Sequence, residues 1–119
     1  MVEVYKMGKT KIKICGLKRP EDIGIVNRLK PDFVGFVFAE RKVDKEQARK
    51  LCEALDPEIP AVGVFVNETI QNVTELCREK IIQIVQLHGD EDAYYIEEIR
   101  KNLPDIPLIK AVRVQSKEQ

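Results

Sequence analysis

The sequence has no tryptophan, a single histidine, three cysteines and no excess of either charge. Twenty Lys and Arg residues balance twenty Asp and Glu residues. This balance argues against a nucleic-acid or membrane-surface binder, because both depend on a basic excess. No apolar run approaches the roughly 18–20 residues of a membrane span. Met1–Lys11 is polar and charged, so we expect no signal peptide and a cytoplasmic protein.

The cysteines and the histidine are too scattered for a disulfide framework or a metal site. Cys15, Cys52 and Cys77 form no CxxC pair, and His88 has no second histidine at ligand spacing. We therefore expect reduced thiols and no metal. The glycine-rich loops GxGxxG and GxxxxGK are also missing, which speaks against a nucleotide-binding sheet.

What the sequence does contain is a regular alternation of apolar and polar segments. Several apolar segments lack polar positions almost throughout, as strands buried on both faces do. The predicted strands are Lys11–Cys15, Phe33–Phe38, Ala61–Val66, Ile84–His88 and Leu108–Val114. Polar segments with helical spacing lie between them and predict helices that begin near Pro20, Asp44, Thr69 and Asp92. Such alternation is typical of a parallel sheet, either doubly wound or closed into a barrel.

Two similar segments, Val-Gly-Phe-Val-Phe and Val-Gly-Val-Phe-Val, favour equivalent positions around a barrel. The predicted fold class is therefore α/β, of the (β/α)8 TIM-barrel family. A closed barrel has eight βα units and about 250 residues, so the five strands of this 119-residue sequence would form a partial barrel. We divide the chain into an N-terminal extension, residues 1–10, and a partial barrel domain, residues 11–119.

Side-chain spacing also predicts which faces are buried. Leu29 continues the apolar face that Ile23 and Val26 begin in the first helix. Lys9, Lys11 and Lys13 occupy alternate positions, which indicates that they lie on the solvated side of the first strand.

Cys15 is the most informative candidate, because active sites of (β/α)8 barrels lie at the carboxyl ends of the strands. It ends the first predicted strand, and Gly16 and a helix N-terminus follow, so the helix dipole would favour the thiolate. A thiolate can remove a proton from carbon or attack as a nucleophile. A buried cysteine can equally be a small apolar side chain, which is how we interpret Cys52 and Cys77.

Three further candidates lie at other strand ends. Gln86 and His88 are two residues apart, so they share a face, where they could bind a polar substrate or bond to neighbouring loops. Arg41 follows the second predicted strand and could clamp a carboxylate through a bidentate pair, or be solvated.

In combination, the motifs of this chain resemble those of phosphoribosylanthranilate isomerase. The shared motifs, in chain order, are Lys-Ile-Cys-Gly-Leu, Pro-Glu-Asp, Val-Gly-Phe-Val-Phe, Arg-Lys-Val, Val-Gly-Val-Phe-Val-Asn, Val-Gln-Leu-His-Gly-Asp-Glu and Ile-Lys-Ala-Val. The resemblance implies an isomerase of tryptophan biosynthesis that uses no cofactor or metal. Its small phosphosugar substrate would be N-(5-phosphoribosyl)anthranilate. An Amadori rearrangement would convert it to 1-(2-carboxyphenylamino)-1-deoxyribulose 5-phosphate.

The resemblance also implies roles for individual residues. Cys15 would be the general base that removes the ribose C2 proton, and Arg41 would position the substrate carboxylate. Gln86 and His88 would line the site near the anthranilate. A related phosphosugar enzyme, indole-glycerol-phosphate synthase, would instead carry a catalytic lysine at the end of the first strand.

The resemblance places other parts of the family's site outside the predicted elements. The family's general acid is an aspartate on the sixth strand, and its phosphate site follows the seventh and eighth strands. The segment Phe38–Arg41 is also shorter than the family pattern. We therefore expect the 119-residue chain alone to be inactive. Its partner would be a second copy or the missing C-terminal half, and the alternative is an inactive partial barrel with a structural or assembly role.

Overall fold

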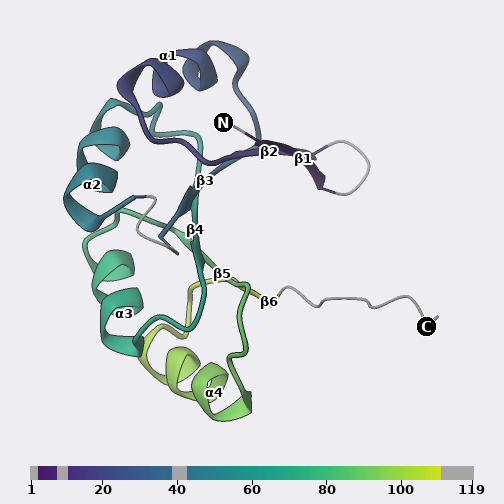
Figure 1. Cartoon of the computed structure of the whole chain (residues 1–119), viewed down its shortest axis with the longest axis vertical. Helices are drawn as coiled ribbons and strands as arrows, with labels where there is room; N and C mark the ends of the chain where they lie inside the picture. Colours follow the sequence, from purple (N-terminus) through teal and green to yellow (C-terminus); the bar gives the residue numbers. More distant parts are fainter. Residues whose placement is uncertain (1–2, 8–10, 39–42, 111–119) are drawn as a thin grey trace.

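The structure, a computed structural model, describes residues 3–7, 11–38 and 43–110. The strands are β1 (Glu3–Met7), β2 (Lys11–Cys15), β3 (Phe33–Val37), β4 (Ala61–Phe65), β5 (Ile84–Leu87) and β6 (Leu108–Lys110). The helices are α1 (Pro20–Leu29), α2 (Lys45–Ala54), α3 (Ile70–Arg78) and α4 (Ala93–Asn102). All six strands form one sheet in chain order, as Figure 1 shows.

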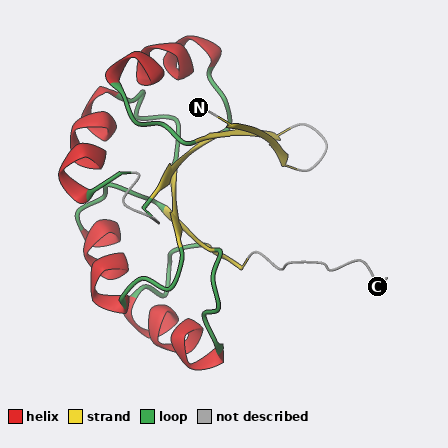
Figure 2. Ribbon diagram, in the orientation of Figure 1, coloured by secondary structure: helices red, strands yellow, loops and turns green. Residues whose placement is uncertain are grey.

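β2 to β6 run parallel, and helices α1 to α4 connect them in turn. The sheet is curved, and all four helices lie on its convex side (Figure 2). The concave side carries no helix from the described part of the chain. This arrangement confirms the predicted fold class, the parallel strands of a partial (β/α)8 barrel. None of the described helices has the length and apolar character that crossing a membrane requires.

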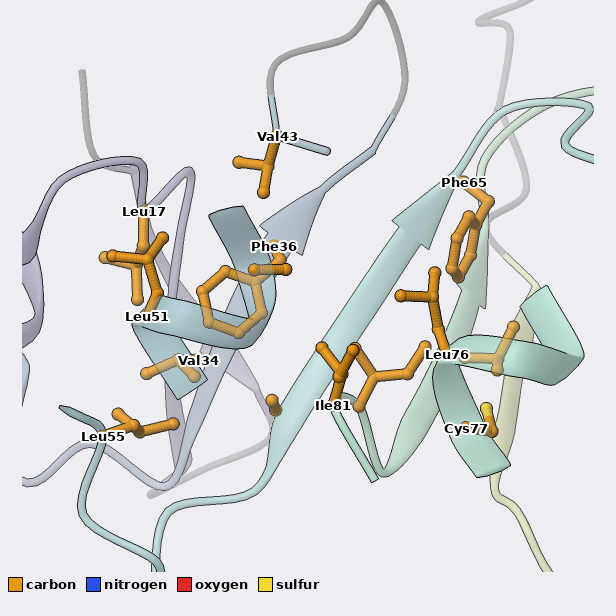
Figure 3. Packing of buried hydrophobic residues seen from close by; sticks show 14 of the residues in the cluster. Leu17, Val34, Phe36, Val43, Leu51, Leu55, Phe65, Leu76, Cys77 and Ile81 are labelled. Atoms are coloured by element: carbon orange, nitrogen blue, oxygen red, sulfur yellow. The ribbon is translucent and has the colours of Figure 1, made fainter. Parts of the chain in front are cut away.

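The main core fills the space between the convex face of the sheet and the helices. Figure 3 shows Val34 and Phe36 of β3 beside Leu51 of α2, all fully or almost fully buried. Leu76 of α3 belongs to the same cluster, as does Phe65 at the end of β4. A smaller cluster, which includes Cys15, Val62 and Val64, lies on the other face of the sheet. The sheet therefore carries a cluster of buried apolar side chains on each face, as the uninterrupted apolar strands predicted.

Helix starts follow local side-chain capping. Asp44 caps α2 by accepting a hydrogen bond from the Gln47 backbone N–H (2.8 Å), as the sequence predicted. α1 begins instead with Pro20, which needs no backbone N–H at that position. The predicted burial of Leu29 is wrong: its side chain is 65% exposed. Leu29 ends α1, and Lys30 turns into the left-handed region (φ 51°).

The N-terminal segment contains a strand that the sequence analysis did not predict. β1 pairs antiparallel with β2, and the register sets Glu3 opposite Cys15 and Met7 opposite Lys11. The first parallel strand therefore has a neighbour on each side, β1 and β3. At the other end, the predicted strand Leu108–Val114 is described as far as Lys110.

Candidate active site

Cys15 lies on the concave face of the sheet, near the carboxyl end of β2. Its side chain is nearly buried (5% exposed) and packs in the cluster with Val62 and Val64 of β4. The residue opposite on β3 is Gly35. A Cβ atom added there would lie 2.6 Å from Cys15 Sγ, closer than non-bonded atoms approach. The thiol thus occupies space that the missing Gly35 side chain leaves open.

The other two cysteines lie in the helical layer, on the far side of the sheet. Cys77 is buried in the main core, where desolvation raises its pKa to about 11. Burial, followed by the charge of Glu53, raises the pKa of Cys52. Both environments disfavour a thiolate, which agrees with the interpretation of these two residues as packing residues.

Gln86 points to the same concave face, because it is paired with Val64 in the β4–β5 register. Its side-chain oxygen accepts a hydrogen bond from Lys13 Nζ at 2.5 Å. The predicted solvated position of Lys13 is therefore wrong: the residue is 5% exposed. Alternation along β2 sends Lys13 and Cys15 to one face, and sheet curvature makes that face an interior.

His88 follows β5 directly and is exposed. Its backbone N–H donates to the Phe65 carbonyl at 2.8 Å, which continues the β4–β5 ladder for one residue. The structure thus places Cys15 and Gln86 on the concave face and His88 at the rim, at the same end of the sheet. The fourth candidate, Arg41, lies outside the described residues.

A buried carboxylate that the sequence analysis missed holds the rim together. The Glu91 side chain is fully buried (0% exposed). It accepts hydrogen bonds from Asn67 N (2.7 Å), Gly89 N (2.9 Å) and Lys110 Nζ (3.0 Å). Burial alone would raise the pKa of Glu91, but these hydrogen bonds outweigh it and hold the pKa below its ordinary value. Its partners come from β6 and from the segments that follow β4 and β5.

A second buried carboxylate shapes the turn after Cys15. Asp22, in the first turn of α1, accepts hydrogen bonds from the backbone N–H groups of Lys18 (3.1 Å) and Arg19 (3.2 Å). Burial opposes ionisation, yet these bonds and the Arg19 charge leave the pKa of Asp22 lowered. Gly16 adopts φ 90°, a conformation that side-chain-bearing residues rarely adopt. The Pro-Glu-Asp motif therefore fixes the path of the chain away from Cys15.

The described residues contain no group of three His, Cys, Asp or Glu side chains that could hold a metal ion. A cavity of about 480 Å³ lies elsewhere, lined by Phe38, Lys45 and Glu68 among others. It opens beside the starts of α2 and α3, and neither Cys15 nor Gln86 lines it. The chemistry that the concave face offers is acid–base or nucleophilic chemistry of a thiol beside an ammonium group.

Residues 12–119 match the sequence family described as N-(5'-phosphoribosyl)anthranilate (PRA) isomerase. The chain is 53% identical over 111 residues to the isomerase of Lachnoclostridium phytofermentans, covering 92% of this chain and 50% of the relative. It is 51% identical over 109 residues to the isomerase of Endomicrobium trichonymphae, covering 90% of this chain and 54% of that relative. The chain thus spans about half the length of the curated relatives it matches.

Solved structures agree with this match. The fold is similar to the phosphoribosylanthranilate isomerase of Thermotoga maritima, with a TM-score of 0.74, 34% identity, and coverage of 89% of this chain and 52% of that one. A solved structure of a phosphoribosylanthranilate isomerase in complex with reduced 1-(o-carboxyphenylamino)-1-deoxyribulose 5-phosphate is also similar. Its TM-score is 0.74 and its identity 34%, with coverage of 89% of this chain and 55% of that one. The chain belongs to the N-(5'-phosphoribosyl)anthranilate isomerase family.

Proposed function

We propose that this chain supplies the first five parallel strands of an isomerase of tryptophan biosynthesis. The reaction is the conversion of N-(5-phosphoribosyl)anthranilate to 1-(2-carboxyphenylamino)-1-deoxyribulose 5-phosphate. The observation that carries the proposal is the position of Cys15, at the carboxyl end of the first parallel strand of a family-matched half-barrel. A related isomerase that binds a reduced form of this product supports the substrate class.

Cys15 acts in this proposal as the general base. A general acid protonates the ribose ring oxygen, the C1–O bond breaks, and a Schiff base forms between C1 and the anthranilate nitrogen. The Cys15 thiolate then takes the C2 proton, and the electrons of the C2–H bond form the enolamine. Tautomerisation returns a proton to C1 and leaves a ketone at C2. C1 is reduced as C2 is oxidised, so no external oxidant or reductant takes part.

The remaining roles are those that the resemblance to the family implies. Gln86 on the concave face and His88 at the rim line the anthranilate end of the substrate, and Arg41 binds its carboxylate. The general acid and the phosphate site come from strands that follow the fifth in a complete barrel. A C-terminal half, or a second copy of the chain, is the proposed partner, and the cytoplasm the proposed compartment. One solved structure is of monomers generated from the dimeric isomerase of T. maritima.

The test joins residues 1–119 to the unmatched C-terminal half of the L. phytofermentans isomerase. We expect the chimaera to restore growth of a tryptophan auxotroph that lacks the isomerase. We also expect it to convert the substrate in vitro, with the product detected by chromatography. Cys15→Ser in this chimaera should lower kcat by several orders of magnitude, since the base contributes about 10²- to 10⁴-fold or more. Cys52→Ser is the matched control and should retain near-normal turnover.

The 119-residue chain without the added half is assayed beside it. Turnover by the chain alone would overturn the expectation that the acid and phosphate sites lie elsewhere. A folded but inactive chimaera would favour the alternative, a partial barrel with a structural or assembly role. Normal turnover of Cys15→Ser would remove Cys15 from the mechanism.

A further inference from the structure

Lys13 is a buried cation on the face of the sheet that carries the candidate base. Lys13 and Cys15 are alternate residues of β2 and are equally buried, at 5% exposure each. Residues two apart on a strand point the same way, so the ammonium group and the thiol share one environment. A buried ammonium is costly unless it has hydrogen bonds or an opposite charge nearby. The position of Lys13 therefore calls for a compensating interaction on this face.

The hydrogen bond to Gln86 fixes where the ammonium group lies. β3 and β4 separate β2 from β5 in the sheet, so the Lys13 side chain reaches across two strands to Gln86 Oε1. Lysine only donates hydrogen bonds, so the amide of Gln86 must turn its oxygen toward Nζ. This bond keeps the charge over the concave face, where the cluster of Cys15, Val62 and Val64 lies.

The side chains of β3 to β5 around Lys13 and Cys15 are largely apolar. On β3 and β4 the concave face carries Phe33, Gly35, Val37, Val62 and Val64, and on β5 it carries Ile84 and Gln86. None of these side chains is ionisable, so no neighbouring charge on β3 to β5 screens the pair. On β1, Glu3 and Tyr5 occupy the register positions opposite Cys15 and Lys13. Burial lowers the pKa of Lys13, and the charge of Cys15 opposes this shift.

We propose that Lys13 is a positioning residue whose ammonium group, held by Gln86, favours the thiolate form of Cys15. The inference rests on the proposed function for the use of that thiolate as a base. It goes beyond that function by naming what makes a nearly buried thiol acidic enough to act. The interaction is reciprocal: a thiolate that stabilises the ammonium is stabilised by it to the same extent.

The experiment measures the pH dependence of Cys15 alkylation by iodoacetamide in the 119-residue chain. Mass spectrometry of the Cys15 peptide separates its rate from those of Cys52 and Cys77. The pH midpoint of the rate reports thiolate formation and does not depend on how accessible the sulfur is. We expect Lys13→Gln to raise the midpoint by about one unit or more, which lowers the rate at neutral pH about tenfold. Lys13→Arg, which keeps the charge, should restore most of the rate.

Lys101→Gln is the matched control, because Lys101 is an exposed lysine on α4 (side chain 71% exposed). The Glu3→Gln variant is measured alone and in combination with Lys13→Gln. These measurements separate any effect of Glu3 on the midpoint from the effect of Lys13. Gln86→Glu covers the case in which Lys13→Gln does not fold. The new carboxylate would still accept a hydrogen bond from Lys13 but would compete with the Cys15 thiolate for the ammonium group. Gln86→Glu should therefore also raise the pH midpoint of Cys15 alkylation.

Equal midpoints for folded Lys13→Gln and Lys101→Gln would overturn the proposal, as would an unchanged midpoint in Gln86→Glu. The thiol titration is independent of isomerase activity. A shifted midpoint in a chimaera without turnover would therefore leave the role of Lys13 standing while the proposed function fails. Turnover by the chimaera with an unshifted midpoint in Lys13→Gln would support the proposed function and overturn the role of Lys13.

Discussion

Glu91 is the residue through which three segments of the rim are joined. Its carboxylate bonds to the backbone of Asn67 and Gly89, and Lys110 Nζ also donates to the Gly89 carbonyl at 2.6 Å. Gly89 directly follows His88, so the position of His88 depends on Glu91. The carboxylate is wholly buried, and its loss would leave several donors without a partner.

We expect Glu91→Gln to destabilise the chain by about 2 kcal/mol at neutral pH, because hydrogen bonds to a charged group are worth about 1.5–3 kcal/mol. The folded-state pKa of Glu91 lies below its ordinary value of 4.5. Its contribution is therefore present above pH 4.5 and is lost as the pH falls through the lowered folded-state pKa. Urea unfolding midpoints from neutral to acid pH measure the difference between the two proteins.

Glu97→Gln, on the exposed side of α4, is the control and should leave the midpoint within error at every pH. The difference in urea midpoint between Glu91→Gln and the unaltered chain should become smaller as the pH falls. A difference that stayed constant, or grew, toward low pH would contradict the assigned ionisation of Glu91.

Single residues were the least predictable part of the site. Cys15 and Gln86 could be found because strand ends follow from local composition. Lys13 was misread, because its burial depends on sheet curvature and on Gln86, 73 residues away. Glu91 was missed for a similar reason: its partners come from other strand ends, and the sequence around it looks like an ordinary polar helix start.

At the scale of elements, caps and apolar patterns made the helices predictable. The Asp44 side chain accepts from Gln47 N, and the Thr69 and Asp92 side chains cap α3 and α4 in the same way. These short helices have little intrinsic stability, so packing and caps decide where they begin. β1 escaped prediction because Glu3–Met7 mixes charged, apolar and aromatic residues without a clear apolar face.

Asp44→Ala is expected to lower the free energy of unfolding by about 1 kcal/mol, the usual cost of losing an N-cap acceptor. The reason is the loss of the bond to the Gln47 N–H at the first turn of α2. Asp44→Asn keeps an acceptor oxygen and should cost little. Equal losses in the two variants, measured by urea unfolding, would mean that the side-chain cap does not stabilise α2.

At the scale of the whole molecule, β1 covers the outer edge of β2. In a closed (β/α)8 barrel the first parallel strand pairs with the eighth along that edge. β1 and a closing strand cannot both pair there. An exposed strand edge invites pairing with other chains, so β1 protects the partial barrel in this form.

Deletion of residues 1–9 should therefore expose the edge of β2 in the 119-residue chain but not in the chimaera with a complete barrel. In the 119-residue chain, amide exchange of β2 should become about tenfold faster or more, because its outer edge loses a partner. In the chimaera with a complete barrel, the same deletion should leave β2 protection and turnover unchanged. Hydrogen-exchange mass spectrometry of the β2 peptide measures both.

Equal loss of protection in both proteins would show that β1 remains paired with β2 when the barrel is complete. Protection unchanged in both would show that the β1–β2 ladder adds nothing to the stability of the edge. Either outcome would contradict the expectation that a closing strand takes the place of β1 beside β2.

The β1–β2 hairpin also bears on the order of events during translation. Its two strands are adjacent in the chain and precede β3 to β6, so they leave the ribosome before the rest of the sheet. When β1 pairs with β2, the outer edge of β2 is covered before β3 to β6 have been made. This pairing would limit the time during which the edge of β2 is open to other chains as the nascent chain grows.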